Sequence, residues 1–363
     1  MSTTVADALL RSLSWGHERV QLVHDRESGL QAVIAIHSTA LGPALGGLRL
    51  RPYAGGLPEA LDDALRLSRA MTLKASAAGL DLGGGKAVIV DDGRAELRGA
   101  RLIAMAREVE RLGGAYITAE DIGTTTADMD LIGEHTSHVV GRSEHGGIGG
   151  DPSPDTARTV FGAIRAGLTA LDGDDALAGR TVGVIGLGKV GGRLAAQLAQ
   201  AGASVVACDP VEAARSAARE AGVELVDGAE QVLERELDVL APCAGGGLIG
   251  VELARALRCR IVCGAANNQL QDEAAADALA ARGILHVPDF LANCGGLIRV
   301  DAERRDDRDP DALERRLAAA QQRTLAVLVE ARERALPPDA VAEEHALRRV
   351  EAAHERELSS VAS

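Results

Sequence analysis

The chain has 363 residues, 46% of them apolar and 1% aromatic, with 53 acidic and 39 basic residues and a formal net charge of −14. This acidic balance, with no basic run in the sequence, argues against nucleic acid as a partner. No apolar stretch reaches the roughly 20 residues of a membrane helix, and the N-terminus lacks the layout of a signal peptide. We therefore expect a cytoplasmic protein without a membrane partner, long enough for two domains of about 100–200 residues each.

The first domain is expected over residues 1–150. Apolar, β-branched runs predict strands, and apolar residues at three- and four-residue spacing predict amphipathic helices. On these criteria the predicted strands are 31–39, 86–92 and 115–118, and the predicted helices are 58–79 and 102–112. Glycines and two prolines at 141–155 indicate the junction to the next domain.

The second domain is expected over residues 151–330. A strand at 181–185, a glycine turn, a helix at 190–201 and a second strand ending in Asp209 indicate a doubly wound parallel sheet. Further strands are expected at 239–241, 261–264 and 284–287. From residue 301 the chain predicts two helices, broken at 336–339, and residues 331–363 are expected to pack back on the first domain.

The five cysteines do not predict a metal site. They show no CxxC spacing and have no histidine tract nearby. Cys259 and Cys263 bracket the apolar run CRIVC, which is more typical of a buried strand than of a ligand pair.

Lysine is rare in this chain: Lys74, Lys86 and Lys189 are the only three, and every other basic residue is arginine. A retained lysine indicates a site that arginine cannot fill, because burial readily lowers the pKa of an ammonium whereas guanidinium stays protonated. Lys74 and Lys86 lie twelve residues apart in one apolar, glycine-rich segment. We therefore expect a function for both.

The sequence Gly186-Leu-Gly188-Lys-Val-Gly191 fits the dinucleotide fingerprint G-x-G-x-x-G and lies between a predicted strand and a predicted helix. The three glycines permit the tight turn, the approach of the pyrophosphate and the packing of helix on strand, respectively. Asp209 is placed to accept hydrogen bonds from the adenosine ribose and to repel a 2′-phosphate, which favours NAD over NADP. Arg215 is the one nearby cation that would accommodate such a phosphate.

Eight other segments carry recognisable motifs. In chain order they are GPALGGLRL (42–50), MTLK (71–74), GLDLGGGKAVI (79–89), TAEDIGTTTADMD (118–130), GDPSPDTA (150–157), APCAGGG (241–247), GAANNQL (264–270) and NCGGLIRV (293–300). Together they resemble the Glu/Leu/Phe/Val dehydrogenase family, most closely its leucine and valine dehydrogenases, over roughly residues 20–300.

The resemblance implies an NAD-dependent homo-oligomer that reversibly deaminates a branched-chain L-amino acid to the 2-oxo acid, ammonium and NADH. It implies an N-terminal α/β substrate domain and a Rossmann domain, with the active site in the cleft between them. The alternatives are the same chemistry on phenylalanine or on a polar or unusual substrate, or a catalytically silent NAD-binding regulatory subunit. The presence of Lys74, Lys86 and Asp121 together argues against a silent protein.

By this resemblance, Lys86 activates the water that attacks the imino acid, and Asp121 moves protons to and from the amino group. Such a base must lose its proton far below the usual lysine pKa of about 10.4, and a second lysine and an apolar wall both favour that shift. Asp121 has an alternative role as a helix N-cap, with Glu120 beside it at the surface.

The other implied roles concern the substrate carboxylate and the cofactor. Lys74, Gly46 and Gly47 would bind the carboxylate; Gly186, Gly188, Lys189, Val190, Gly191 and Asp209 would bind NAD; Thr156, Ala244 and either Asn267 or Asn268 would lie at its nicotinamide end, with Asn267 preferred.

The implied side-chain pocket is aliphatic. Leu45 and Val300 replace the lysine and serine of the glutamate enzymes, and Leu297 lies one helical turn before Val300. An apolar wall would leave a glutamate carboxylate unpaired, which argues against glutamate. Ala119 would crowd a large ring, and Met71 completes the predicted pocket. A branched aliphatic substrate fits best.

Three residues depart from the family pattern in this region: Val287 in place of the aromatic that usually precedes the proline, Cys294 in NCGG, and Arg299 in place of a small polar residue. Cys294 is interpreted as a small buried substitute or as a reactive thiol. Arg299 is expected either to face solvent or to place a cation by the pocket, which would admit a polar or acidic substrate.

Overall fold

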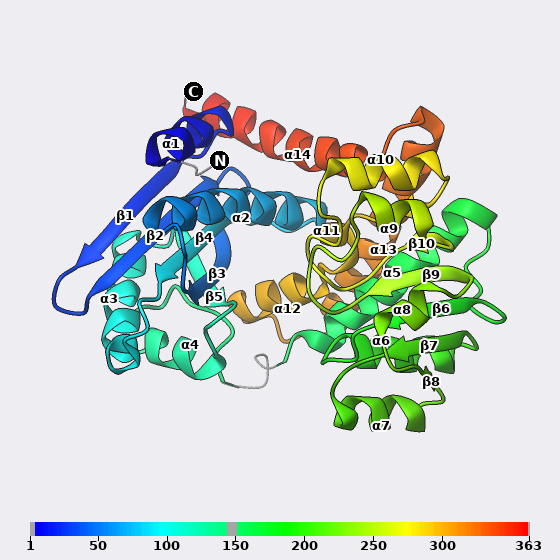
Figure 1. Cartoon of the computed structure of the whole chain (residues 1–363). Helices are drawn as coiled ribbons and strands as arrows, with labels where there is room; N and C mark the ends of the chain where they lie inside the picture. Colours follow the sequence, from blue (N-terminus) through cyan, green and yellow to red (C-terminus); the bar gives the residue numbers. More distant parts are fainter. Residues whose placement is uncertain (1–3, 144–150, 362–363) are drawn as a thin grey trace. The chain divides into compact units, whose positions relative to one another are not determined.

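The computed structural model describes residues 4–143 and 151–361, and the contacts within the chain divide it into two compact units. Unit 1 comprises Met1–Gly150, Val300–Arg308 and Ala346–Ser363, and unit 2 comprises Asp151–Arg299 and Asp309–His345. Within the predicted junction at 141–155, residues 144–150 lie outside the described part of the chain. Figure 1 labels most of the helices and strands.

A five-stranded mixed sheet forms the centre of unit 1 (Figure 1). In chain order its elements are α1 (Val5–Ser14), β1 (Arg19–Asp25), β2 (Leu30–Ser38), β3 (Ala44–Arg51), α2 (Leu57–Ala77), β4 (Gly83–Val90), η1 (Ala95–Leu97), α3 (Arg98–Arg111), β5 (Tyr116–Glu120) and α4 (Thr126–Gly133). The strands lie in the order β1-β2-β4-β3-β5. The β1–β2 and β2–β4 pairs are antiparallel, whereas β3 runs parallel to β4 and to β5.

Neither β1 nor β3 is among the predicted strands. β3 has the sequence ALGGLRLR, in which glycine and arginine interrupt the apolar pattern that identifies a strand. Gly46 is required there by a close approach of main chains, because a Cβ atom at this position would lie 1.7 Å from the carbonyl oxygen of Gly85. Tertiary packing therefore overrides the weak strand propensity of this segment.

The two faces of this sheet differ in chemistry, because alternate residues of a strand point to opposite faces. One face carries an apolar cluster that includes Leu48 and side chains of α3 and α4. The other face packs against α2, where Val88 lies in a cluster with Leu61. Lys86 precedes Val88 by two residues, and Arg49 pairs with Val88 across the strands. Both charged side chains therefore belong to the α2 face.

A six-stranded parallel sheet forms the centre of unit 2. The elements that lie wholly in this unit are α5 (Ser153–Asp172), β6 (Thr181–Ile185), α6 (Gly191–Gln200), β7 (Ser204–Cys208), α7 (Glu212–Glu220), β8 (Glu224–Leu225), α8 (Ala229–Leu233), β9 (Leu237–Pro242), α9 (Val251–Ala256), β10 (Cys259–Val262), α10 (Glu273–Ala281), β11 (Leu285–His286), α11 (Asp289–Ala292) and α13 (Pro310–Arg334). The strand order β11-β10-β9-β6-β7-β8 is that of a Rossmann fold, which confirms the predicted doubly wound sheet. The order reverses between β6 and β9, where dinucleotides bind in such sheets.

The division between the units falls within α12 (Gly295–Arg304) and α14 (Pro338–Val361). The later part of α14 belongs to unit 1 and contacts the end of α2 and the loop that follows it. There the Ser76 hydroxyl donates a hydrogen bond of 2.8 Å to the carbonyl oxygen of Ala346, and Arg349 donates one of 2.6 Å to that of Leu80.

Among residues 4–143 and 151–361, no helix is both long and apolar enough to cross a bilayer. The same residues include no group of three or more histidine, cysteine, aspartate or glutamate side chains placed to hold a metal ion. All five cysteines are free thiols.

Candidate active site

Lys86 and Asp121 form a close ion pair in unit 1, with 2.5 Å between Lys86 Nζ and Asp121 Oδ2. Lys86 lies within β4, and only 7% of its side chain is exposed. Asp121 directly follows β5, and 19% of its side chain is exposed. Because β3 separates β4 from β5 in the sheet, the pairing requires a strand between them without bulky side chains. Gly47 meets that need, since a Cβ atom there would lie 2.6 Å from Cβ of Asp121.

The structure excludes one of the two roles considered for Asp121, that of a helix N-cap. The N-cap of α4 is Thr125, which forms a capping box with Asp128. The alternative interpretation of Asp121 as the N-cap is therefore wrong. Glu120 is exposed and accepts a hydrogen bond of 2.9 Å from Thr126, so it is Asp121, and not its neighbour, that reaches Lys86.

Three further residues of unit 1 complete this cluster and were not predicted. Arg49 on β3 donates to Asp121 Oδ2 at 3.0 Å and to Asp63 Oδ2 at 2.9 Å. Asp63 on α2 is 3% exposed and also accepts a hydrogen bond of 2.8 Å from the Tyr53 hydroxyl. The signal available in the sequence was the period of two in β3, which places Arg49 on the same face as Gly47.

The cluster shifts the pKa of each partner. Burial lowers the pKa of Lys86, and the positive charge of Arg49 lowers it further, against the opposing attraction of Asp121. Burial alone would raise the pKa of Asp121, but the charges of Lys86 and Arg49 outweigh it and hold that pKa below its usual range. Burial alone would also raise the pKa of Asp63, but the hydrogen bond from Tyr53 and the charge of Arg49 hold that pKa below its usual value. Unit 1 thus holds an ionised carboxylate against a lysine that loses its proton unusually easily.

The other predicted substrate residues of unit 1 lie on three neighbouring elements. Lys74 and Met71 are half-buried on α2. Leu45 on β3 is 2% exposed and pairs in register with Gly84 of β4 and with Ile117 of β5. Ala119 on β5 pairs with Gly47.

Both predicted pocket residues near the C-terminus lie on α12, where Leu297 is buried and Val300 half-buried. Cys294 is buried, at 1% exposure. Arg299 donates a hydrogen bond of 2.6 Å to Asp155 Oδ2, and the Asp155 side chain is 4% exposed. Arg299 is therefore neither an isolated surface charge nor an unpaired cation, because a buried carboxylate of the same unit compensates it.

The glycine turn of unit 2 shows the three features expected of a dinucleotide site. Gly186 has a φ of +97°, which favours glycine. A Cβ atom on Gly191 would lie 2.0 Å from the carbonyl oxygen of Gly186, so the first turn of α6 packs directly on the strand end. A Cβ atom on Gly188 would meet nothing within 4 Å, which leaves this main chain open to a ligand. The residues present therefore fit a bound pyrophosphate.

Asp209 follows β7 and is oriented by main-chain donors. It accepts a hydrogen bond of 2.7 Å from the Leu187 N–H in the glycine turn and one of 2.8 Å from the Val211 N–H. Arg215 donates to the carbonyl oxygen of Val226 at 2.8 Å. The Asp209 carboxylate is thus bonded directly to the main chain of the turn, while Arg215 is bonded to the carbonyl oxygen of Val226.

The residues predicted near the nicotinamide lie on separate segments of unit 2. Ala244 follows β9 and its backbone nitrogen would lie 2.8 Å from a Cβ atom on Gly186, so it lies at the point where the strand order reverses. The Asn267 side-chain oxygen accepts a hydrogen bond of 2.9 Å from Asn293. Thr156 is half-buried in the first turn of α5.

Asn268 differs from Asn267 in its main chain. It has a φ of +51°, in the left-handed region, and its N–H donates to the Asp289 carboxylate. Asn268 thus shapes the turn that carries Asn267.

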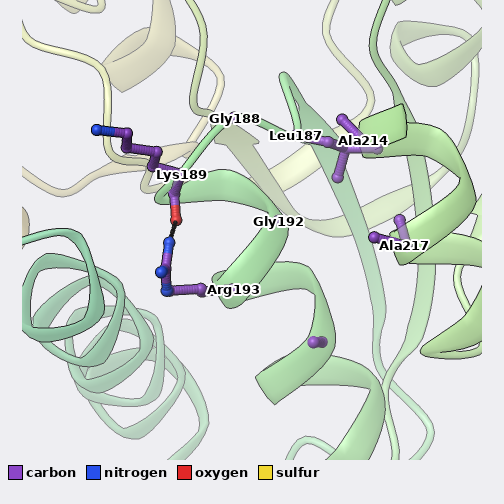
Figure 2. Close-up of a pocket in the computed structure, with 9 residues that line it drawn as sticks. Leu187, Gly188, Lys189, Gly192, Arg193, Ala214 and Ala217 are labelled. Carbon is purple, nitrogen blue, oxygen red and sulfur yellow. Dashed lines mark hydrogen bonds between the residues drawn. The ribbon is translucent and has the colours of Figure 1, made fainter. Parts of the chain in front are cut away.

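A cavity of about 520 Å³ adjoins the glycine turn (Figure 2). Its lining includes Gly188, Lys189 and Arg193 on the α6 side and Ala214 of α7. Arg193 donates a hydrogen bond of 2.5 Å to the carbonyl oxygen of Lys189, which ties its side chain to the turn (Figure 2). Val190, the N-cap of α6, is half-buried. A concave surface with two basic side chains, Lys189 and Arg193, thus borders the glycine turn.

Comparisons with known proteins cover both units. Residues 17–138 match the family model described as Glu/Leu/Phe/Val dehydrogenase, dimerisation domain, and residues 209–357 match that of Glutamate/Leucine/Phenylalanine/Valine dehydrogenase. Residues 167–242 match the NAD binding domain of D-isomer specific 2-hydroxyacid dehydrogenases.

Individual relatives are similar over most of the chain. The chain is 45% identical over 349 residues to a valine dehydrogenase of Streptomyces virginiae, covering 95% of this chain and 97% of the relative. It is 44% identical over 290 residues to a leucine dehydrogenase of Thermoactinomyces intermedius, covering 80% and 79%. Among solved structures, L-tryptophan dehydrogenase from Nostoc punctiforme is 33% identical with a TM-score of 0.85, covering 96% and 99% of the two chains.

Proposed function

Because the chain belongs to the Glu/Leu/Phe/Val dehydrogenase family, we propose that it catalyses the NAD-dependent, reversible oxidative deamination of a branched-chain L-amino acid to the 2-oxo acid and ammonium. The observation that carries the proposal is the buried ion pair of Lys86 and Asp121. It supplies the base and the proton carrier that this reaction needs. The similarity to valine and leucine dehydrogenases supports the choice of substrate.

Lys86 is the base in this proposal. A base is most effective when its pKa lies near the working pH, and burial together with Arg49 lowers the pKa of Lys86 in that direction. In its neutral form the amine takes a proton from the water that attacks Cα of the imino acid. NAD, when bound, would supply the hydride acceptor for the preceding step, in which the Cα hydride leaves the amino acid.

Asp121 carries protons to and from the substrate nitrogen. Its Oδ2 atom lies within hydrogen-bond distance of Lys86, so that a proton passes between the two groups without large movement. The lowered pKa of Asp121 keeps it ionised, so that it accepts a proton from the α-ammonium group of the amino acid and later returns a proton to the nitrogen that leaves as ammonia.

Lys74, Gly46 and Gly47 are proposed to bind the substrate carboxylate. Lys74 supplies a positive charge from α2. The glycines let Gly85 and Asp121 approach the main chain of β3 closely beside Lys86, because a side chain at either position would collide with them.

The substrate side chain is proposed to contact Leu45, Met71, Ala119, Leu297 and Val300. These positions bear no charge, which favours valine, leucine or isoleucine. The pairing of Arg299 with Asp155 supports the same choice, since a compensated arginine gives an acidic substrate no free partner.

We assign cofactor binding to unit 2. Gly186, Gly188, Lys189, Val190 and Gly191 would hold the pyrophosphate at the N-terminus of α6. Asp209 would bind the adenosine ribose, and its charge favours NAD over NADP. Thr156, Ala244 and Asn267 are proposed to contact the nicotinamide end.

We further propose that the protein is a cytoplasmic homo-oligomer that associates through unit 1. Leu10 and Leu13 of α1 are 66% and 75% exposed, and Leu22 on the edge strand β1 is 49% exposed. An exposed apolar stripe beside an unpaired strand edge is typical of an interface. Light scattering is expected to give a mass above the 37.5 kDa of one chain for the wild type and a lower mass for Leu13→Glu.

The test of the activity is NADH formation at alkaline pH with a panel of L-amino acids: valine, leucine, isoleucine, phenylalanine, glutamate and alanine. NADP is run in parallel. We expect turnover with valine, leucine or isoleucine and NAD, and kcat/KM at least tenfold lower with glutamate, a difference of about 1.4 kcal/mol. Turnover of glutamate or phenylalanine alone would overturn the assignment of substrate, and silence across the panel would overturn that of activity.

A further inference from the structure

The Arg49 side chain joins two carboxylates that belong to different elements of unit 1. Its Nε atom donates to Asp121 at 3.0 Å, and its Nη1 atom donates to Asp63 at 2.9 Å. The Arg49 side chain is 13% exposed and that of Asp63 is 4% exposed. A planar guanidinium with both donors engaged at once has a fixed orientation, which a lysine at this position would not reproduce.

Asp63 is itself held in place from several sides. The Tyr53 hydroxyl donates to its Oδ2 atom at 2.8 Å, and Arg66 donates to its Oδ1 atom at 2.7 Å. Arg51 approaches Oδ2 at 3.7 Å. The Asp63 carboxylate is therefore held rigidly on α2. By binding Nη1 of Arg49, it orients Nε of the same side chain toward Asp121.

Lys86 and Arg49 use the same oxygen of Asp121. When Lys86 is protonated, two positive charges share one carboxylate. When Lys86 gives up its proton, Arg49 remains as the permanent cation on that oxygen, because guanidinium does not lose its proton in proteins. Without Arg49, a half-buried Asp121 would depend on the Lys86 ammonium alone for its charge balance.

We propose that Arg49, anchored by Asp63, is a positioning residue that keeps Asp121 ionised and in place while Lys86 changes its protonation state. This inference rests on the proposed function of Lys86 and Asp121. Arg49 acts through these two residues and is not assigned a contact with substrate.

Other titratable groups of the neighbouring elements are accounted for. On α2, Glu59 pairs with Arg51, Asp62 with Arg11, and Asp63 with Arg49 and Arg66, while Arg69 lies over the Trp15 ring and Lys74 is half-buried. On β2, His37 bonds to Thr72 of α2. On β5, the Tyr116 hydroxyl donates to the carbonyl oxygen of Gly46, and Glu120 is exposed. Of these, only Asp63 bonds to Arg49. Arg51 provides a matched control, because it lies two residues along the same strand and its ion pairs, with Glu59 at 3.8 Å and Asp63 at 3.7 Å, do not include Asp121.

The experiment compares wild type with Arg49→Met, Arg49→Gln, Arg49→Lys and Arg51→Met. The first readout is the pH profile of kcat/KM for L-valine. Both neutral Arg49 variants are expected to shift the acid limb of this profile to higher pH by about one unit. Lys86 is then the sole cation on Asp121 and holds its proton more tightly. Arg49→Lys is expected to keep the limb near wild type with a lower kcat, and Arg51→Met to keep the whole profile.

The second readout needs no turnover. Competitive acetylation across pH, followed by mass spectrometry, reports the neutral fraction of each of the three lysines, with exposed Lys189 as internal reference. Lys86 is expected to become reactive at higher pH in Arg49→Met and Arg49→Gln than in wild type. An unchanged reactivity profile, or a loss of kcat with the pH limb unmoved, would overturn the inference. If the wild type deaminates no amino acid, the proposed function is overturned. The acetylation profile of Lys86 would still test the role of Arg49, because it needs no turnover.

Discussion

In unit 1 the proposed catalytic groups are side chains that β3, β4, the end of β5 and α2 bring together, whereas in unit 2 the proposed phosphate site is main chain within six consecutive residues. The first site depends on charge: Lys86, Asp121, Arg49 and Asp63 all lie within it, and each has a shifted pKa. The second depends on shape, through the positive φ of Gly186 and the open space at Gly188. Substitutions in the two regions should therefore have different consequences: those in unit 1 change the charge of the site, and those in the glycine turn change its shape.

The largest expected effect is on catalysis in unit 1. Asp121→Asn keeps the size of the side chain but removes the charge that faces Lys86 and Arg49. We expect kcat to fall about 10²- to 10⁴-fold, the usual range for loss of a proton-transfer group, with the affinity for NAD unchanged. Glu120→Gln is the matched control and should retain wild-type turnover, because Glu120 is exposed and bonded to Thr126. Equal losses in both variants would contradict the assignment.

Replacing a glycine by alanine is expected to have different effects at the two sites. Gly46→Ala places a Cβ atom against the Gly85 carbonyl and forces β3 and β4 apart, so we expect a loss of about 3 kcal/mol in unfolding free energy. Gly188→Ala meets open space and should leave stability unchanged while weakening NAD binding about tenfold or more. Thermal unfolding and calorimetric titration with NAD measure the two effects. A stable Gly46→Ala protein, or undiminished NAD affinity in Gly188→Ala, would break the distinction.

The third prediction concerns pH and unit 1. His37 is buried and bonded to Thr72 at 2.9 Å, and burial lowers its pKa to about 4. In the unfolded chain histidine titrates near 6.5, so as the pH falls below 6.5 the unfolded state takes up the proton first and stability decreases. The expected loss is about 2 kcal/mol between pH 7 and 4.5.

Hydrogen exchange of the β2 and α2 peptides across this pH range measures that loss. His37→Asn should flatten the dependence, because the side chain that titrates is gone. A slope that is the same in wild type and variant would rule out His37 as its source.

The smallest expected effect is on cofactor choice in unit 2. Asp209→Ala should raise the Kd for NAD about tenfold, which is about 1.4 kcal/mol of binding free energy. It should also reduce the preference for NAD over NADP. Arg215→Met should leave NADP use as it is, since Arg215 is bonded to Val226. Steady-state kinetics with both cofactors provide the measurement. A gain or loss of activity with NADP in Arg215→Met would show that this arginine contacts the 2′-phosphate of NADP.

The contrast between the two sites also explains what the sequence allowed to be predicted. The glycine turn and Asp209 are local in sequence, so spacing alone identified them together with their sheet. Lys86 and Asp121 were found through motifs of a known family, and the lysine composition drew attention to Lys86 independently. Arg49, Asp63 and Tyr53 were not found, because their association depends on the register of β3 and on how α2 packs over it. The salt bridge of Arg299 with Asp155 joins residues 144 positions apart and leaves no local signal.

The central claim, that Lys86 is a base and that cofactor binding is a separate property of unit 2, is tested most directly by Lys86→Arg. Arginine keeps the positive charge beside Asp121 but cannot become neutral. We predict that kcat for L-valine falls about 10²- to 10⁴-fold while the calorimetric Kd for NAD stays within about twofold of wild type. Turnover within tenfold of wild type, or a loss of NAD binding that parallels the loss of turnover, would contradict the account.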